Sequence, residues 1–220
     1  MSPYAYCVNN PLIFIDPNGK DVYQVDENGN SVGRIKNKNF DQFQVVSVDA
    51  DGNKTVTASS EEYKYGTVIG GISNIETGKK DENGKPINLS IYGIKGSKEG
   101  ESIHQFLSDN TNVEYGRWDC KSNLGEINVI GTSHQQAEEN SGLYVKNFLS
   151  QNNWFGYLQT QDHNHPSGNN MPSGMDEKGN IQKNGDIPFI KSIEQKNPNV
   201  IFRVYGKGKG YRYYNSQGPY

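Results

Sequence analysis

The chain has 220 residues, of which 32% are hydrophobic and 21% are charged. This length is sufficient for one domain with appended segments, although a mean hydropathy of −0.85 predicts a modest core. The net charge of −3 excludes the strongly basic surface typical of nucleic-acid-binding proteins, so we expect no nucleic-acid partner. We also expect no membrane span and no signal peptide, because no apolar run is long enough and the first 15 residues lack a basic start. Two cysteines are too few for a disulfide framework or a four-cysteine zinc site.

The first twenty residues combine two turns with a short apolar segment. Asn9-Asn10-Pro11 predicts a turn, Leu12 to Ile15 a strand, and Asp16 to Gly19 a second turn. The pattern Tyr-x-Tyr-x-x-Asn-Asn-Pro, followed by Asp-Pro-x-Gly, resembles the last segment of the Rhs repeat-associated core. The resemblance implies that residues 1–20 are the tail of an Rhs shell and that a toxin follows from about residue 20.

Residues 21–86 are polar and favour β-strands. The pattern Asp-x-x-Gly-Asn/Lys recurs at residues 26–30, 49–53 and 81–85, and again at 176–180. An Asp side chain can bond to the backbone that follows it, and Gly tolerates positive φ, so each copy predicts a hairpin tip. We therefore expect a β-hairpin-rich extension over residues 21–86, with a second domain at residues 87–216.

Helix and strand patterns alternate after residue 86. We predict, in chain order, a strand at Ile87–Ile94, a helix at Glu101–Ser108, strands at Val113–Trp118 and Glu126–Gly131, a helix at Leu143–Leu149, a strand at Trp154–Asp162, a helix at Ile187–Lys196 with Ile187, Ile190 and Ile193 inward, and a hairpin of Val200–Tyr205 with Tyr211–Asn215. The predicted fold class is α/β (α+β), a mixed β-sheet flanked by helices behind a β-rich N-terminal extension.

The most informative stretch is His163-Asn164-His165-Pro166, at the end of a strand pattern. Residues two apart in a strand share a face, so both imidazoles can point at one place, as two ligands of a metal must. Pro166 should end the strand, because it cannot donate to a sheet ladder. A third ligand must come from beyond the loop of residues 167–173, which is rich in Gly, Asn and Pro.

This stretch resembles the JAB/MPN metalloprotease family, also called JAMM, whose signature is His-x-His-Pro, a spacer and Ser-x-x-Asp. It looks most like the RadC branch, in which His-Asn-His-Pro-Ser-Gly and a later Pro-Ser occur together. The resemblance implies a JAB/MPN-like domain with the order of elements given above. It also implies a Zn²⁺ ion held by His163, His165 and an aspartate, with Ser173 donating to the oxyanion.

Two aspartates compete for the third ligand. Asp176 stands three residues after Ser173, as in the literal signature, but a hairpin-tip pattern begins there. Asp186 is a natural helix N-cap, and Ile187-Pro188 suits a first turn. Residues 175–185 would then be an extra hairpin between the serine and the aspartate. We favour Asp186 and keep Asp176 as the alternative.

A hydrolytic zinc site also needs a base for its water. The family resemblance implies a glutamate on an early strand, tens of residues before the histidines. Glu114 fits this place, on the predicted strand Val113–Trp118 and with Gly116 two residues later. Glu126, at the start of the next predicted strand, is the reserve candidate.

Together these resemblances imply an Rhs-type effector whose toxin domain is a zinc-dependent peptidase or isopeptidase. Its substrate would be a protein inside the target cell, reached by delivery without a signal peptide of its own, and the toxin class implies a cognate immunity protein. Two alternatives stay open. One is a catalytically inactive binding module of the same fold, and the other is a metal-dependent nuclease, which the acidic charge disfavours.

Overall fold

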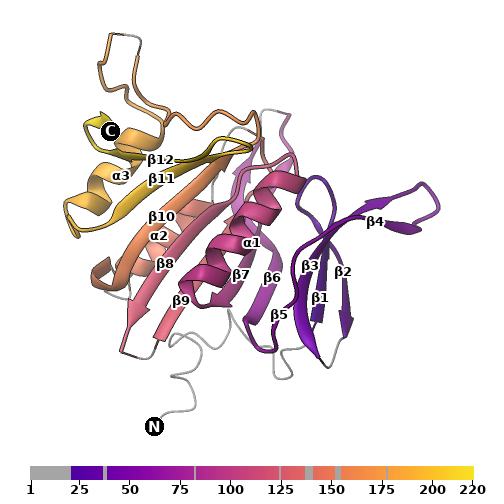
Figure 1. Cartoon of the computed structure of the whole chain (residues 1–220). Helices are drawn as coiled ribbons and strands as arrows, with labels where there is room; N and C mark the ends of the chain where they lie inside the picture. The colour runs from indigo at the N-terminus through magenta and orange to yellow at the C-terminus, as the bar shows by residue number, and fades with distance from the viewer. Residues whose placement is uncertain are drawn as a thin grey trace.

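The computed structural model describes residues 21–36, 39–81, 83–123, 125–136, 141–151, 155–176 and 178–220. The turns and strand expected in residues 1–20 lie outside the described residues. A small sheet and a large sheet stand side by side, with helices on both faces of the large one (Figure 1). The small sheet contains β1 (Asp21–Val25), β2 (Ser31–Lys36), β3 (Phe40–Val48), β4 (Lys54–Ser59) and β5 (Tyr63–Lys64).

The large sheet is mixed and has the strand order β13-β12-β11-β10-β8-β9-β7-β6. Its central pair, β10 with β11, is parallel, and its other paired strands are antiparallel. Its strands are β6 (Val68–Lys80), β7 (Pro86–Lys95), β8 (Gly116–Ser122), β9 (Gly125–Thr132), β10 (Leu158–His165), β11 (Ile201–Gly206), β12 (Gly210–Asn215) and β13 (Gly218–Pro219). The helices are α1 (Ser97–Asn110), α2 (Ser141–Gln151) and α3 (Asp186–Glu194), with a short 3-10 turn, η2, at Phe155–Tyr157.

The core beneath α1 joins the two sheets. Ile103 and Leu107 of α1 pack with residues from both the large sheet and the small one, among them Tyr92, Ile130, Tyr23 and Phe43. The small sheet therefore shares a core with α1. The domain boundary expected between residues 86 and 87 falls after the first residue of β7. Strand β6, which precedes it, pairs with β7 and belongs to the large sheet.

A second core fills the opposite face of the large sheet, where α2 and α3 pack (Figure 1). Ile187, Ile190 and Ile193 of α3 are fully buried there, which confirms the predicted inward face of this helix. Trp118 and Cys120 of β8 lie in the same core, and Cys120 is a free thiol. None of the helices in the described part of the chain has both the length and the apolar character needed to cross a membrane.

The predicted order of elements from the strand at residue 87 onward is confirmed, but the bounds of α1, β8 and β10 differ from the predicted ones by three or four residues at one end or both. Strand β10 runs from Leu158 to His165 and not from Trp154 to Asp162. Helix α1 begins four residues earlier than expected. Its first turn is polar and contains Gly100, so it lacks the apolar spacing that predicts a helix; Gly100 lies against Asn128, where a side chain would have no room. Strand β8 begins at Gly116 and not at Val113, so Glu114 precedes the strand.

All four predicted hairpin tips are present. In each, the Asp side chain accepts hydrogen bonds from the backbone N–H groups two and four residues later, at 2.8–3.0 Å. The glycine has positive φ in every copy, between 72° and 83°. The sequence pattern predicted these turns because their geometry is set within five residues.

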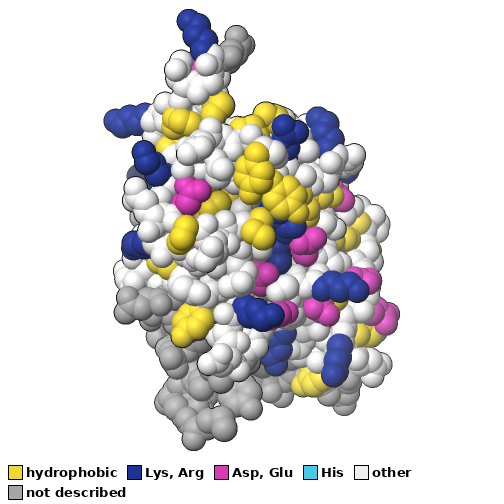
Figure 2. Space-filling view, turned by 60° about the vertical axis from the view of Figure 1, so that its left-hand side comes forward, with side chains coloured by type: hydrophobic (Ala, Val, Ile, Leu, Met, Phe, Trp, Pro, Cys, Tyr) yellow, Lys and Arg dark blue, Asp and Glu magenta, His cyan; other side chains and the backbone are white. Residues whose placement is uncertain are grey.

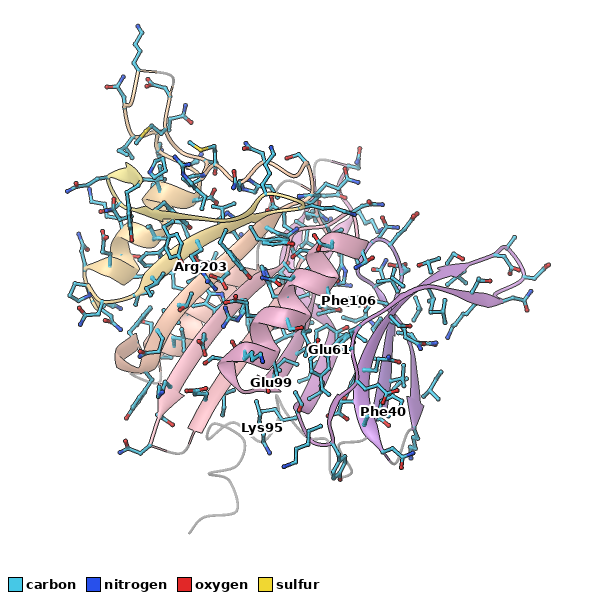
Figure 3. All side chains as sticks on the ribbon, in the orientation of Figure 1. Phe40, Glu61, Lys95, Glu99, Phe106 and Arg203 are labelled. Atoms are coloured by element: carbon cyan, nitrogen blue, oxygen red, sulfur yellow. The ribbon has the colours of Figure 1, made fainter. Side chains whose placement is uncertain are left out.

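A buried ion network ties α1 to the centre of the large sheet. Asp162 on β10 is paired with Arg117 on β8 and with Arg203 on β11, and its side chain is fully buried. Arg203, which is labelled in Figure 3, donates to Asp162 at 2.8 Å and to Glu101 of α1 at 2.6 Å. Burial opposes ionisation of Asp162, but the two arginines outweigh it and hold the pKa of this carboxyl below its ordinary value.

His104 of α1 is a structural histidine, buried between α1 and the large sheet. Its Nε2–H donates to the carbonyl of Tyr115 at 3.2 Å, so Nδ1 accepts from the Tyr211 hydroxyl at 3.3 Å. Burial lowers the pKa of His104 from 6.5 to about 4.

We expect His104 to make the fold sensitive to acid. Between pH 6.5 and about 4 the unfolded chain binds a proton that the buried imidazole does not. The free energy of unfolding should therefore decrease as the pH is lowered from 6.5 to about 4. His104→Gln keeps a donor for Tyr115 and should flatten this dependence. Thermal unfolding in the presence of a chelator measures the effect without a contribution from metal release. Identical pH dependence in the parent and the variant would contradict the expectation.

Candidate metal centre

Two histidines leave the end of β10 on one face of the large sheet. His163 and His165 have ring centroids 5.0 Å apart, and the strand ends at His165, immediately before Pro166, as predicted. The side chains between and beside them, Asp162 and Asn164, alternate to the α1 face. The histidines therefore face α3.

Asp186, the first residue of α3, brings a carboxylate to the two imidazoles. Its Oδ2 atom lies 3.2 Å from Nε2 of His163 and 3.5 Å from Nε2 of His165. Ligands bound to zinc at about 2.0–2.1 Å in a tetrahedron lie roughly 3.3 Å from one another. The two nitrogen–oxygen distances therefore match the spacing that a shared cation would impose. In the described part of the chain, this is the one group of His, Cys, Asp and Glu side chains close enough to hold an ion.

The three side chains become more exposed from the strand outward. The side chain of His163 is 7% exposed, that of His165 15% and that of Asp186 20%. The candidate centre is thus closed on the side of the sheet and reachable from solvent on the side of α3. A catalytic site needs such an open position, whereas a structural zinc site is closed by four protein ligands.

Ser173 and Asp186 are bonded to each other although twelve residues separate them. The Ser173 N–H donates to Oδ2 of Asp186 at 2.6 Å, and the Asp186 N–H donates to Oγ of Ser173 at 3.0 Å. The serine thus holds both the backbone and the carboxylate of Asp186, while its own hydroxyl hydrogen is left to donate elsewhere. The N-cap of α3 is Gly185, so the predicted N-cap role of Asp186 is wrong and it is the first helical residue.

The segment between Ser173 and Asp186 is a projecting hairpin with a closed base (Figure 1). Met175 bridges Ile181 near the base, and the Asp176–Asn180 turn forms the tip. At the base, a side chain on Gly185 would place its Cβ 2.7 Å from Cα of Gly174, so the two backbones are in direct contact. The insertion therefore leaves the serine and the aspartate next to each other.

His165 is oriented by a backbone carbonyl outside the centre. Its Nδ1 lies 3.1 Å from the carbonyl oxygen of Asn169, which can only accept, so Nδ1 carries the hydrogen. In the neutral ring the Nε2 lone pair is then left for a cation placed between it and Asp186. A metal-binding histidine usually has its other nitrogen fixed in this way.

The carboxyl of Asp186 is held in its ionised form. Burial opposes ionisation, but the charge and hydrogen bond of His163, the hydrogen bond of His165 and the Ser173 N–H outweigh it and keep the pKa well below its ordinary value. An ionised carboxylate beside two imidazoles can hold a cation once both imidazoles are neutral.

The alternative aspartate and the reserve glutamate lie outside this cluster. Asp176 opens the exposed hairpin tip, where its carboxylate accepts from Lys178 and Asn180. Glu126 stands opposite Lys121, five rungs along β8 from Gly116, or roughly 17 Å at 3.4 Å per residue. Its carboxylate accepts from Lys121 at 2.8 Å.

Glu114 is buried immediately before β8, near the end of β10. Gly116 is the partner of His163 in the ladder between β8 and β10, and Glu114 stands two residues before it. Val113 and Tyr115, on either side of Glu114, pack in the core beneath α1. Alternation along this segment gives Glu114 the face that carries His163.

The residues that hold these groups in place carry no recognisable signal in the sequence. Asn164, between the two histidines, bonds to the backbone on either side of Glu114. Nothing in its sequence context distinguishes it from a spacer, because its partners are backbone groups about 50 residues away in the chain. The contact of His165 with Asn169 is also not indicated by the sequence, because the acceptor is a backbone carbonyl.

The fold and the cluster together define the class of this domain, a mixed sheet with flanking helices and a His-x-His pair beside an aspartate. Residues 92–191 match the family model of JAB-like toxin 1, from within β7 to within α3. The match supports a JAB-like toxin domain in this part of the chain, and it includes every candidate site residue described above. No curated protein and no solved structure matches the chain.

We expect Asp186 and not Asp176 to bind a metal ion together with the histidines. Asp186→Asn removes the ionised oxygen that both imidazoles face, so zinc affinity should fall by more than the roughly 10–100-fold typical of an outer partner. Asp176→Asn should leave it unchanged. Competition with a chromophoric chelator measures both variants. Equal losses, or a loss confined to the Asp176 variant, would exclude Asp186 as the third ligand.

We also expect the projecting hairpin to be dispensable for metal binding. Removal of residues 175–184 and direct joining of Gly174 to Gly185 gives Ser-Gly-Gly-Asp, the literal Ser-x-x-Asp spacing. The two glycines are already about as close as consecutive residues, whose Cα atoms are about 3.8 Å apart. The shortened chain should bind zinc with unchanged stoichiometry, measured by metal analysis after gel filtration. A folded but metal-free product would show that the hairpin helps to form the centre.

Proposed function

We propose that the chain carries a zinc-dependent peptidase or isopeptidase toxin that acts on a protein of the target cell. The observation that carries the proposal is the convergence of two Nε2 atoms on one carboxylate oxygen at 3.2 and 3.5 Å. His and carboxylate ligands with an open position are the donor set of hydrolytic zinc sites. A bound zinc ion would lower the pKa of water to about 7 and polarise the scissile carbonyl.

The chain's own residues have separate roles in this proposal. His163, His165 and Asp186 hold the ion, and Asn169 and Ser173 fix the orientation of two of them. Glu114 accepts the proton of the attacking water and gives it to the leaving amine. The Ser173 hydroxyl, whose oxygen accepts the Asp186 N–H, keeps its hydrogen to donate to the oxyanion.

The reunited Ser173 and Asp186 favour an active enzyme over an inactive binding module of the same fold. An insertion between the serine and the aspartate of the signature could separate them and abolish catalysis, but the closed base of the hairpin keeps Ser173 and Asp186 hydrogen-bonded. The nuclease alternative has less support. Figure 2 shows acidic and basic side chains interspersed on one face, and the net charge is −3.

A polar pocket near Glu114 offers room for part of a protein substrate. Its volume is about 350 Å³, and its lining includes Val113, His134 and several side-chain amides, among them Asn28, Asn88 and Gln135. Glu114 and the three candidate metal ligands lie outside this lining. The Glu114 N–H donates to the carbonyl of Gln135 at 2.9 Å, which connects this wall to the proposed base. Amide-lined walls are suited to hydrogen bonding with a polar peptide segment.

The delivery route belongs to the same proposal. The motif of residues 1–20 supports attachment to an Rhs shell, and the toxin family supports delivery into a target cell and a cognate immunity protein that protects the producer. These partners are inferred from class and from resemblance.

Replacement of the base tests the proposal directly. Glu114→Gln keeps the size and removes the proton acceptor, so the variant should lose toxicity by the roughly 10²–10⁴-fold that general acid–base catalysis contributes. Colony counts after controlled expression in bacteria measure toxicity, and metal analysis should show zinc content equal to that of the parent.

Glu126→Gln is the matched control and should remain toxic, because Glu126, on β9, stands opposite the end of β8 that is far from Gly116. A Glu114→Gln chain that kills as well as its parent would rule out this chemistry.

A further inference from the structure

Asn164 makes three hydrogen bonds to the segment that carries Glu114. Its side-chain oxygen accepts the Tyr115 N–H at 2.6 Å, and its side-chain nitrogen donates to the Val113 carbonyl at 3.2 Å. Its backbone N–H donates to the Tyr115 carbonyl at 3.2 Å. The side chain is almost fully buried, at 1% exposure of the residue. Asn164 therefore holds the backbone on both sides of Glu114.

These bonds replace a strand ladder that has ended. The paired register of β8 with β10 stops at Gly116 opposite His163, and Glu114 lies beyond it. A side-chain amide offers the same donor and acceptor as a backbone peptide. The backbone N–H of Asn164 still bonds to Tyr115, and the side chain adds an acceptor for the Tyr115 N–H and a donor for the Val113 carbonyl. An aspartate, serine or threonine side chain at position 164 could not supply both the donor and the acceptor in the same planar arrangement.

The position of Asn164 in the chain connects the base to the ligands. It lies between His163 and His165, so one strand end holds the imidazoles on one face and grips the Glu114 segment from the other. Movement of this segment would change the distance from Glu114 to the candidate centre without changing the ligands. Displacements of about 1 Å in an active site can cost about 100-fold in rate.

We propose that Asn164 is the positioning residue for Glu114. This inference rests on the proposed function for its catalytic consequence, but the restraint on residues 113–115 is a separate structural statement. Asn164→Ala leaves the Tyr115 N–H and the Val113 carbonyl without these partners in a buried place, so the segment should open more often. The metal ligands are untouched by this change.

The first experiment measures the restraint without catalysis. Hydrogen exchange is followed in full-length, zinc-loaded Glu114→Gln protein, with and without Asn164→Ala. The peptide that covers residues 111–116 should exchange faster in the double variant, and zinc stoichiometry should be unchanged. Gln161→Ala is the matched control, because Gln161 is a buried amide of the same strand. Its side-chain nitrogen donates to the backbone carbonyl of Asp162. It should not alter exchange at residues 111–116.

The second experiment is a double-mutant cycle for toxicity. Asn164→Ala alone should reduce killing about 100-fold, and it should cause no further loss when Glu114 is already Gln, because it acts through that residue. If Asn164→Ala does not fold, Asn164→Asp keeps the size and the acceptor for Tyr115 and removes the donor to Val113. It should give a smaller change in the same direction in both experiments.

Three results would overturn the inference: unchanged exchange at residues 111–116, additive losses of toxicity, or loss of zinc from the Asn164 variant. Failure of the proposed function has a different signature. A fully toxic Glu114→Gln protein would reject the peptidase chemistry, while the exchange measurement would still decide whether Asn164 restrains the segment.

Discussion

The buried pairing of Asp162 with two arginines is the constraint on which the site depends. Asp162 stands directly opposite Arg117 on one neighbouring strand and Arg203 on the other, so one carboxylate fixes the register of three strands. A slip of one residue would turn Asp162 to the face of α3 and His163 to the face of α1. It would also separate buried charges, and loss of one partner of such a pair costs about 3–5 kcal/mol. The ligand geometry on one face is thus set by electrostatics on the other.

Asp186, the candidate third ligand, is positioned by packing and by a single pair of hydrogen bonds. The number of residues between Ser173 and Asp186 does not determine its position. Three isoleucines fix α3 against the sheet, and Asp186 begins that helix, so the carboxylate arrives with the helix. Ser173 then locks both the backbone and the side chain of Asp186. A hairpin can be inserted between them because its two ends meet at Gly174 and Gly185. The candidate ligands thus stand at the ends of rigid elements, and the insertion is confined to the loop between them.

The sequence predicted what local patterns determine. The strand before Pro166, the inward face of α3 and the hairpin tips each depend on residues within a few positions of one another. The start of β8 was predicted too early, because Val113 and Tyr115 are apolar at strand spacing although Glu114 lies outside the ladder. What holds that segment is a side chain about 50 residues away, and no local pattern records such a partner. The reciprocal bonds of Ser173 and Asp186 were equally invisible, since the intervening hairpin closes only in three dimensions.

The structural unit that supports the candidate centre is larger than the segment that matches the toxin family. The match ends at residue 191, yet Arg203 on β11 supplies half of the charge that stabilises Asp162, and Phe202 and Val204 of the same strand pack in the core beneath α3. It begins at residue 92, yet Tyr23 and Phe43 of the small sheet fill the core beneath α1. Because α1 also contacts β8, whose first residue lies opposite His163, the small sheet supports the site through that helix. Tyr23 and Phe43 are therefore continuous with the core beneath α1, and β6 with the large sheet that carries the candidate centre.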